Sequence, residues 1–367
     1  KLLNQPIRRK NIPNEKWYRV FLDCCRFETD PTNRSPDTNN EPNVCTSEMM
    51  YTLFSTLMNR AHSLKLRESD SSNILLCLTT NPLLDQIKTK SLRIADETIW
   101  HADVYARFGD LIERSTHLRK LNLSLRFDQA PSEMLESLAN AIRIHRIRLA
   151  QSHWLDEQDG EQVLFKLVGG GGHNGIVVRL LQNPQSQLQH LELSNMRLDD
   201  DHFIPIVQLL PTSQLKILDV SCNRIQSRGV FEFARQLSRI QSLKKVAMGD
   251  NPWLRSAQAG ECGLALLQGL RENYSVEEFG SGMNGNLLLL QDFVVPQAFL
   301  LMHYLDINRA GRRLLEVSSN IPLGLWPLVL ERAGKKISYL GFRYHDPRWG
   351  QGPRRANAVF FLMRNLP

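Results

Sequence analysis

The chain has 367 residues, 42% of them apolar, and a formal net charge of +7. This is enough apolar material for a large core, in several globular domains or in one repeat array. Because no run of 18 uncharged apolar residues occurs, we expect no membrane-spanning helix. The six cysteines lack any CxxC or Cys/His spacing, which favours reduced thiols in the core and an intracellular, cytoplasmic protein.

The first 72 residues predict an irregular N-terminal cap. Residues 28–44 are polar and rich in Pro and Asn, which indicates an exposed loop. Residues 47–63 carry apolar side chains at helical spacing. A strand is then expected at residues 74–78, where the regular part of the chain begins.

A sequence pattern recurs along the middle of the chain at intervals of 27 and 28 residues. Residues 215–225 read LxxLxLxxNxI, and similar stretches begin at Leu188 and Leu243. The alternating apolar residues predict a short strand with one buried face. Asn223, at the ninth position, has an amide that can bond backbone groups where the chain turns. Apolar residues then follow at four-residue spacing, so each unit is predicted to be strand, turn and helix.

Weaker copies extend the pattern in both directions. Strands are expected from Leu118, Ile144 and Val276, and residues 302–307 predict a last strand. A degenerate unit is possible around Leu92 and Ile94. Helices are expected at residues 104–114, 132–142 and 175–181, and an insertion containing four consecutive glycines separates the units at 144 and 188.

These units resemble the ribonuclease-inhibitor-like class of leucine-rich repeats. The resemblance implies an α/β solenoid over residues 73–308, a horseshoe with a concave parallel sheet and convex helices. Residues 309–367 are expected to form a basic helical cap, and they look similar to the C-terminus of uncharacterised algal proteins. The family also implies binding of a protein on the concave face, so we expect a monomeric, non-enzymatic scaffold. A regulator of a GTPase or another enzyme is the alternative that the family suggests.

Side chains that alternate with the buried ones should line the concave face. This face is predicted to run from basic to mixed and acidic, which suits a protein partner of complementary charge. The alternative is an ordinary solvated sheet surface. The residues predicted to bind the partner are Lys120, Asn122, Arg146, Arg148, His190, Glu192, Asp219, Lys245, Glu278 and Tyr304.

The last 67 residues carry the net positive charge, with 11 Lys or Arg against 4 Asp or Glu. Aromatic residues lie between the basic ones, which suits single-stranded nucleic acid as well as an acidic protein or membrane surface. The alternative is a solubilising cap. The candidate residues of this basic tail are Lys335, Lys336, Arg343, Arg348, Arg354 and Arg355.

Other motifs favour structural roles. The glycines at 169–172 lack the Lys-Ser/Thr of a phosphate-binding loop, so a flexible loop is expected. The acidic run at 199–201 precedes a predicted helix and suits its N-terminal dipole better than a metal. Trp154 and Trp253 occupy a position that is normally buried. No catalytic constellation, cofactor site or metal site is predicted.

Overall fold

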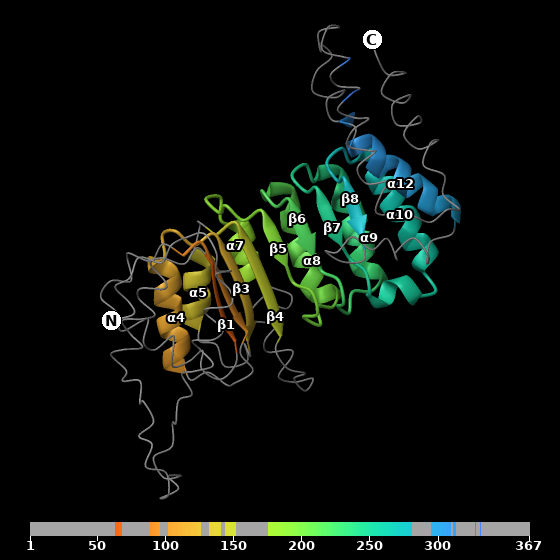
Figure 1. Ribbon diagram of the computed structural model, residues 1–367. Helices are drawn as coiled ribbons and strands as arrows, with labels where there is room; N and C mark the ends of the chain where they lie inside the picture. The colour runs from red at the N-terminus through yellow and green to blue at the C-terminus, as the bar shows by residue number, and fades with distance from the viewer. Residues whose placement is uncertain are drawn as a thin grey trace, which may run out of the picture.

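Within its described residues, the molecule is built on one parallel sheet of eight strands whose spatial order follows the chain from β1 to β8 (Figure 1). Each strand pairs in parallel with the strand before it. The strands are β1 Ser63–Arg67, β2 Ser91–Ala95, β3 Lys120–Leu125, β4 Arg146–Gln151, β5 His190–Glu192, β6 Ile217–Asp219, β7 Lys245–Ala247 and β8 Glu278–Gly280. The computed structural model describes residues 63–67, 89–95, 102–125, 132–140, 144–151, 175–280, 295–309, 311–312, 327 and 331.

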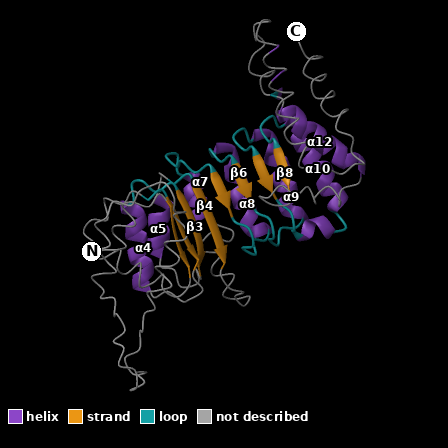
Figure 2. Cartoon of the chain, in the orientation of Figure 1, coloured by secondary structure: helices purple, strands orange, loops and turns teal. Residues whose placement is uncertain are grey.

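Helices connect the strands and form a second layer, in which consecutive helices pack against one another (Figure 2). In the described part of the chain, short 3₁₀ helices lie at Leu210–Thr212, Leu237–Arg239 and Pro252–Arg255. The α-helices are α4 Ala102–Arg114, α5 Ser132–Asn140, α7 Ile176–Gln182, α8 Asp200–Leu209, α9 Ser227–Gln236, α10 Ala259–Glu272 and α12 Val295–Arg309.

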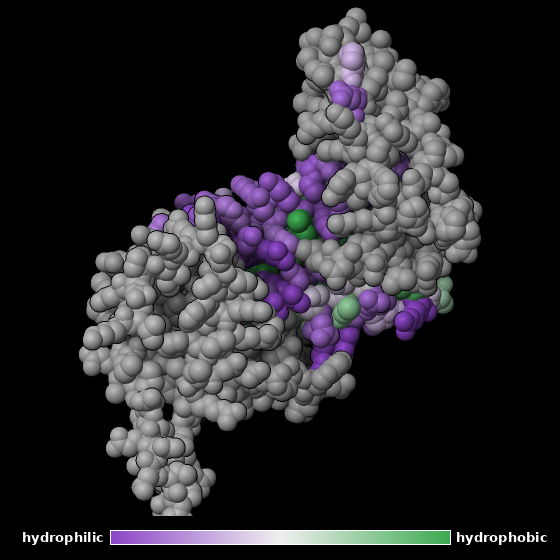
Figure 3. Space-filling model, viewed as in Figure 1, coloured by the Kyte–Doolittle hydropathy of each residue, from purple (hydrophilic) through white to green (hydrophobic). Residues whose placement is uncertain are grey.

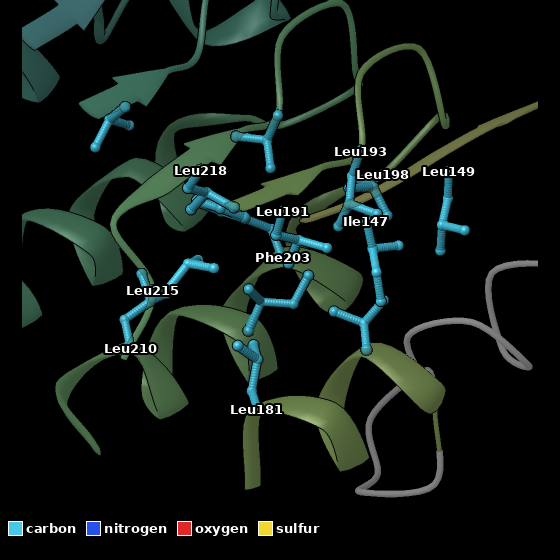
Figure 4. Close-up of a cluster of buried hydrophobic side chains, with 14 of the residues drawn as sticks. Ile147, Leu149, Leu181, Leu191, Leu193, Leu198, Phe203, Leu210, Leu215 and Leu218 are labelled. Atoms are coloured by element: carbon cyan, nitrogen blue, oxygen red, sulfur yellow. The ribbon is translucent and has the colours of Figure 1, made fainter. Parts of the chain in front are cut away.

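The core lies between the sheet and this helix layer. The register of the strands places one apolar residue of each strand in a continuous row, and alternate positions add further rows. Figure 4 shows part of it, with Ile147, Leu191 and Leu218 from three strands near Phe203 of α8. All four are fully buried. No unit could bury these side chains alone, so stacking of the units creates the core.

The asparagine at the ninth position of the repeat links neighbouring turns. The Asn223 amide nitrogen lies 2.9 Å from the carbonyl oxygens of Leu193 and Val220, and its side-chain oxygen accepts from the N–H groups of Met196 and Leu198. Asn251 occupies the same position one unit later. Its side chain bonds Val220 and Met248 and accepts from Ile225 N–H. These buried amides satisfy backbone groups that the turns leave without sheet partners.

The residue before the ninth position has a left-handed backbone in three consecutive units, in which Met196, Asn223 and Asn251 occupy that position. Asn195, Cys222 and Asp250 have φ of 57°, 56° and 55°. Asn and Asp tolerate this conformation better than most residues do. It turns Cys222 outward, so this thiol is exposed, contrary to the expectation that it lies in the core, whereas Cys262 is buried.

Helix α12 corrects the sequence prediction of a last strand at residues 302–307. Leu301 and Leu305 are buried on this helix. Their four-residue spacing fits one face of a helix and also fits the alternation of a strand, because four is a multiple of two. Short apolar runs cannot be assigned to strand or helix by periodicity alone. Pro296 in the first turn favours a helix start, because proline's fixed φ suits it there.

The N-terminal end of the sheet also differs from the prediction. Strand β1 lies within residues 1–72, which were expected to form an irregular cap, and it pairs with β2. Strand β2 confirms the degenerate unit around Leu92 and Ile94, both of which are buried. The strand expected at 74–78 and the loop at 28–44 lie outside the described residues. No helix in the described part of the chain is long and apolar enough to cross a membrane.

Candidate functional site

The sheet side chains that alternate with the core residues lie on the opposite side of the sheet from the helix layer. We call this side the free face. The strand register aligns its side chains in two rows. The first row holds Ser91, Lys120, Arg146, His190, Ile217, Lys245 and Glu278, and the second holds Arg93, Asn122, Arg148, Glu192, Asp219 and Ala247. The structure thus places nine of the ten residues that were predicted to bind a partner on one surface.

Tyr304, the tenth predicted residue, is not on this surface. It belongs to α12, where it is partly buried against the core. The Arg312 guanidinium carbon lies 5.7 Å from its ring centroid. Its predicted place on the free face was wrong because the segment is a helix and not a strand.

A buried carboxylate lies at the middle of the free face. The Glu192 side chain is only 6% exposed, and it contacts two arginines on the neighbouring strand β4. Arg146 Nη2 donates a hydrogen bond of 3.1 Å to Oε2. Arg148 Nε lies 3.1 Å from Oε1, without the angle of a hydrogen bond. A buried carboxylate needs such compensation, because the loss of hydration costs several kcal/mol or more.

His190 lies in the same cluster, with Nε2 4.0 Å from Glu192 Oε2. Burial, assisted by the positive charges of Arg146, Lys245 and Lys120, lowers the pKa of His190 from 6.5 to about 4. The ring is therefore neutral near pH 7. It adds no positive charge to this part of the free face under those conditions.

The charged side chains on the C-terminal half of the face pair with one another. On the free face Lys245 Nζ lies 3.1 Å from Glu278 Oε2, and just before these two strands Lys244 Nζ lies 2.8 Å from Glu277 Oε1. Asp219 is 2% exposed and its Oδ1 accepts from the N–H and the hydroxyl of Ser221. The acidic groups of this half are therefore either paired with a lysine or buried and hydrogen-bonded within the protein.

Exposure also changes along the face. Arg93 and Lys120 are exposed, and Asn122, Arg146 and Arg148 are half-buried, whereas Ala247 is fully buried. Figure 3 shows hydrophilic residues gathered over the central part of the molecule, with small hydrophobic spots among them. The most exposed charged side chains of the free face, Arg93 and Lys120, are thus on β2 and β3. Sequence reasoning missed Arg93, although the alternation of Leu92 and Ile94 around it could have revealed it.

The other candidate motifs have structural roles or lie outside the described residues. Asp199 is the N-cap of α8 and accepts from His202 N–H at 3.1 Å, so the acidic run belongs to a helix start. Trp253 is fully buried, as expected. Within the described part of the chain, no group of three His, Cys, Asp or Glu side chains could hold a metal. The basic tail at 335–355, the glycine run and Trp154 lie outside that part.

A parallel sheet in chain order, with consecutive helices layered against it, is a leucine-rich-repeat-like α/β fold. No family model matches the chain, and no curated protein matches it.

Three solved structures show a distant likeness. An actin-binding site 2 structure of leiomodin-1 is 15% identical over 50% of this chain and 91% of its own, with a TM-score of 0.37. The C-terminal domain of tropomodulin from Caenorhabditis elegans is 14% identical over 58% and 98%, with a TM-score of 0.34. A protein from Bacteroides fragilis is 12% identical over 57% and 69%, with a TM-score of 0.28. At these values the likeness says nothing about what this chain binds.

Proposed function

We propose that this protein is a non-enzymatic scaffold that binds a protein partner on the free face of its sheet. One observation supports the proposal most strongly. Strands β2–β4 present accessible polar and charged side chains in register on the side of the sheet opposite the described helix layer. A rigid sheet that holds its side chains at fixed spacing can make many simultaneous contacts with little loss of conformational entropy.

The proposal includes the finer details that the repeat pattern suggests. We infer a ribonuclease-inhibitor-like repeat, and a horseshoe whose concave side is the free face. The repeat array then begins at β1, near residue 63, and α12 closes its described end. Residues 309–367 remain proposed as a C-terminal cap, and no cofactor is part of this function.

Site-specific photo-crosslinking tests the proposal directly. A photoreactive amino acid would replace Asn122 or Ile217 on the free face, in separate variants of the full chain. Matched controls would carry it at Glu113 of α4 or Gln268 of α10, which are both exposed. After illumination in a cell extract, mass spectrometry identifies the proteins that are joined to each variant.

We expect a protein to be crosslinked from Asn122 or Ile217 on the free face and not from Glu113 or Gln268 on the helix layer. Crosslinks confined to Glu113 and Gln268 would place the interaction on the helix layer and refute the proposal. Crosslinks to nucleic acid alone would refute a protein partner. Melting curves of all four variants check that the substitutions leave the fold intact.

A further inference from the structure

Four cationic side chains, Arg93, Lys120, Arg146 and Arg148, lie together on three adjacent strands, and we call them the basic patch. We propose that the basic patch binds an acidic segment of the protein partner through the carboxylates of that segment. This inference rests on the proposed function and adds to it the charge and the docking position of the partner.

The strand register determines the spacing of the patch. Lys120 of β3 is aligned with Arg146 of β4, and Asn122 lies between Arg93 and Arg148 in the next row. Neighbouring strands are about 4.8 Å apart, and alternate residues along one parallel strand are about 6.6 Å apart. An extended acidic chain repeats its side chains on one side at this same distance, so several carboxylates can meet cations at once.

Within the described residues, the patch has an excess of positive charge. Glu192 on β5 is the acidic group that contacts it, and it forms ion pairs with both Arg146 and Arg148. Asp219 on β6 is turned to Ser221. Among the described residues, four cations face one contacting carboxylate, and His190 is neutral near pH 7.

Glu192 also positions the two arginines. It uses Nη2 of Arg146 and Nε of Arg148, while the side chains remain 41% and 36% exposed. A guanidinium has five N–H donors in a fixed plane, so each arginine retains donors for a second carboxylate. Holding the side chain in place lowers the entropy that is lost when a partner binds.

The charge pairs elsewhere on the free face favour docking of the acidic segment at β2–β4. At β7 and β8 Lys245 pairs with Glu278, and just before these strands Lys244 pairs with Glu277. An acidic segment placed there would have to compete with those carboxylates. At β2–β4 it meets exposed Arg93 and Lys120, for which the structure shows no carboxylate within the described residues.

The test measures binding of a fluorescein-labelled polyglutamate peptide to the purified full chain by fluorescence anisotropy. A polylysine peptide and a single-stranded oligothymidine of equal length serve as the other probes. The test variant carries Arg93→Glu and Lys120→Glu. The control carries Arg114→Glu and Arg239→Glu, which change the net charge equally at exposed positions of the helix layer.

We expect polyglutamate to bind and polylysine not to bind, with affinity that falls as salt is added. The Arg93→Glu/Lys120→Glu variant should bind polyglutamate at least about tenfold more weakly, whereas the control should stay within about twofold. The neutral pair Arg93→Gln and Lys120→Gln should lie between them, which guards against a folding defect as the cause.

Equal losses in the test and control variants would show that net charge and not the basic patch is recognised, and would overturn the inference. If the Arg93→Glu/Lys120→Glu variant still bound polyglutamate, the site that binds acidic segments would lie elsewhere on the protein. Tighter, patch-dependent binding of oligothymidine would assign the patch to nucleic acid. If crosslinks from Asn122 still identify a protein while polyglutamate fails to bind, the scaffold function stands and only its acidic partner is refuted.

Discussion

At the scale of single residues, Asn223 shows how one side chain can hold two repeat units together. Its amide is buried and reaches backbone groups both in its own turn and in the turn of the preceding unit. An aliphatic side chain there would leave several of those groups buried without partners, at about 1–3 kcal/mol each. Met196 occupies the same position one unit earlier and is buried. The chain of amides therefore ends at that unit.

We predict that Asn223→Ala lowers the free energy of unfolding by about 3 kcal/mol, because the freed N–H and carbonyl groups remain out of reach of water. Asn140→Ala, at the exposed end of α5, is the matched control and should change it by less than about 0.5 kcal/mol. Urea denaturation of both variants measures the difference. Equal effects would show that the amide ladder contributes little.

His190 makes stability depend on pH. Its pKa in the folded protein is about 4, below the ordinary 6.5 that the unfolded chain retains. Between these values the unfolded state binds more protons, so protonation favours unfolding. The stabilising effect of a neutral ring is complete above pH 6.5 and is lost as the pH falls toward 4.

We therefore expect His190→Gln to be less sensitive to acid than the wild type between pH 6.5 and 4. The wild type should lose about 1–2 kcal/mol more than the variant across this range, less than the pKa difference alone gives because the ring is partly hydrated. Thermal melts at several pH values measure this. Parallel pH profiles for the two proteins would contradict it.

At the scale of elements, the packing of α9 against α10 depends on a glycine. A Cβ on Gly269 would lie 2.5 Å from the backbone oxygen of Ala234 and 3.0 Å from Leu237 Cβ. The two helices approach this closely because Gly269 has no side chain. Gly260, in the first turn of the same helix, has nothing within 4 Å of such a Cβ.

The same substitution in one helix should thus have opposite effects. Gly269→Ala should destabilise the protein by about 1–3 kcal/mol, because a backbone atom cannot move aside as a flexible side chain can. Gly260→Ala should leave stability unchanged or raise it by about 0.5 kcal/mol, since alanine restricts the unfolded chain more than glycine. Thermal denaturation of the pair tests this, and a neutral Gly269→Ala would show that α9 and α10 can separate freely.

Strands β4 and β5 show why a simple charge reversal on the free face is a poor test of binding. Glutamate at both Arg146 and Arg148 would place two new carboxylates beside the buried Glu192. Removing the partners of a buried charge costs about 3–5 kcal/mol, so lost binding could reflect lost structure. Arg93 and Lys120 avoid this difficulty because both are exposed.

At the scale of the whole molecule, the described surface offers little apolar area for self-association. The large hydrophobic side chains exposed on it are Leu264 of α10, at 56%, and Leu300 of α12, at 49%. The free face presents like charges at β2–β4, which repel a second copy of themselves. A stable dimer requires a much larger apolar interface.

We accordingly predict that the full chain is a monomer, and sedimentation velocity should give the mass of one chain. A dimer would contradict this prediction. In that case a Leu264→Ser/Leu300→Ser variant would show whether the two exposed leucines form the contact, because only then would the double substitution restore the monomer.

The amino-acid sequence determined the repeat itself. The LxxLxLxxNxI pattern contains a strand period and a turn residue within eleven positions, so β3 to β8 and their helices follow from local chemistry. It also predicted the free-face positions of Arg146, Arg148 and Glu192, because side chains alternate along a strand. Where the local pattern suited two structures, as at residues 302–307, the sequence could not distinguish strand from helix.

Only the tertiary structure decided which of these charges are available. Glu192 is 46 residues from Arg146, and the stacking of β5 on β4 brings the two within 3.1 Å and buries the carboxylate. The same stacking pairs Lys245 with Glu278 and leaves Arg93 and Lys120 exposed. Ion pairs and burial depend on contacts between side chains of different repeat units. The repeat pattern specifies the structure of each unit, but it does not specify which side chains of neighbouring units face one another.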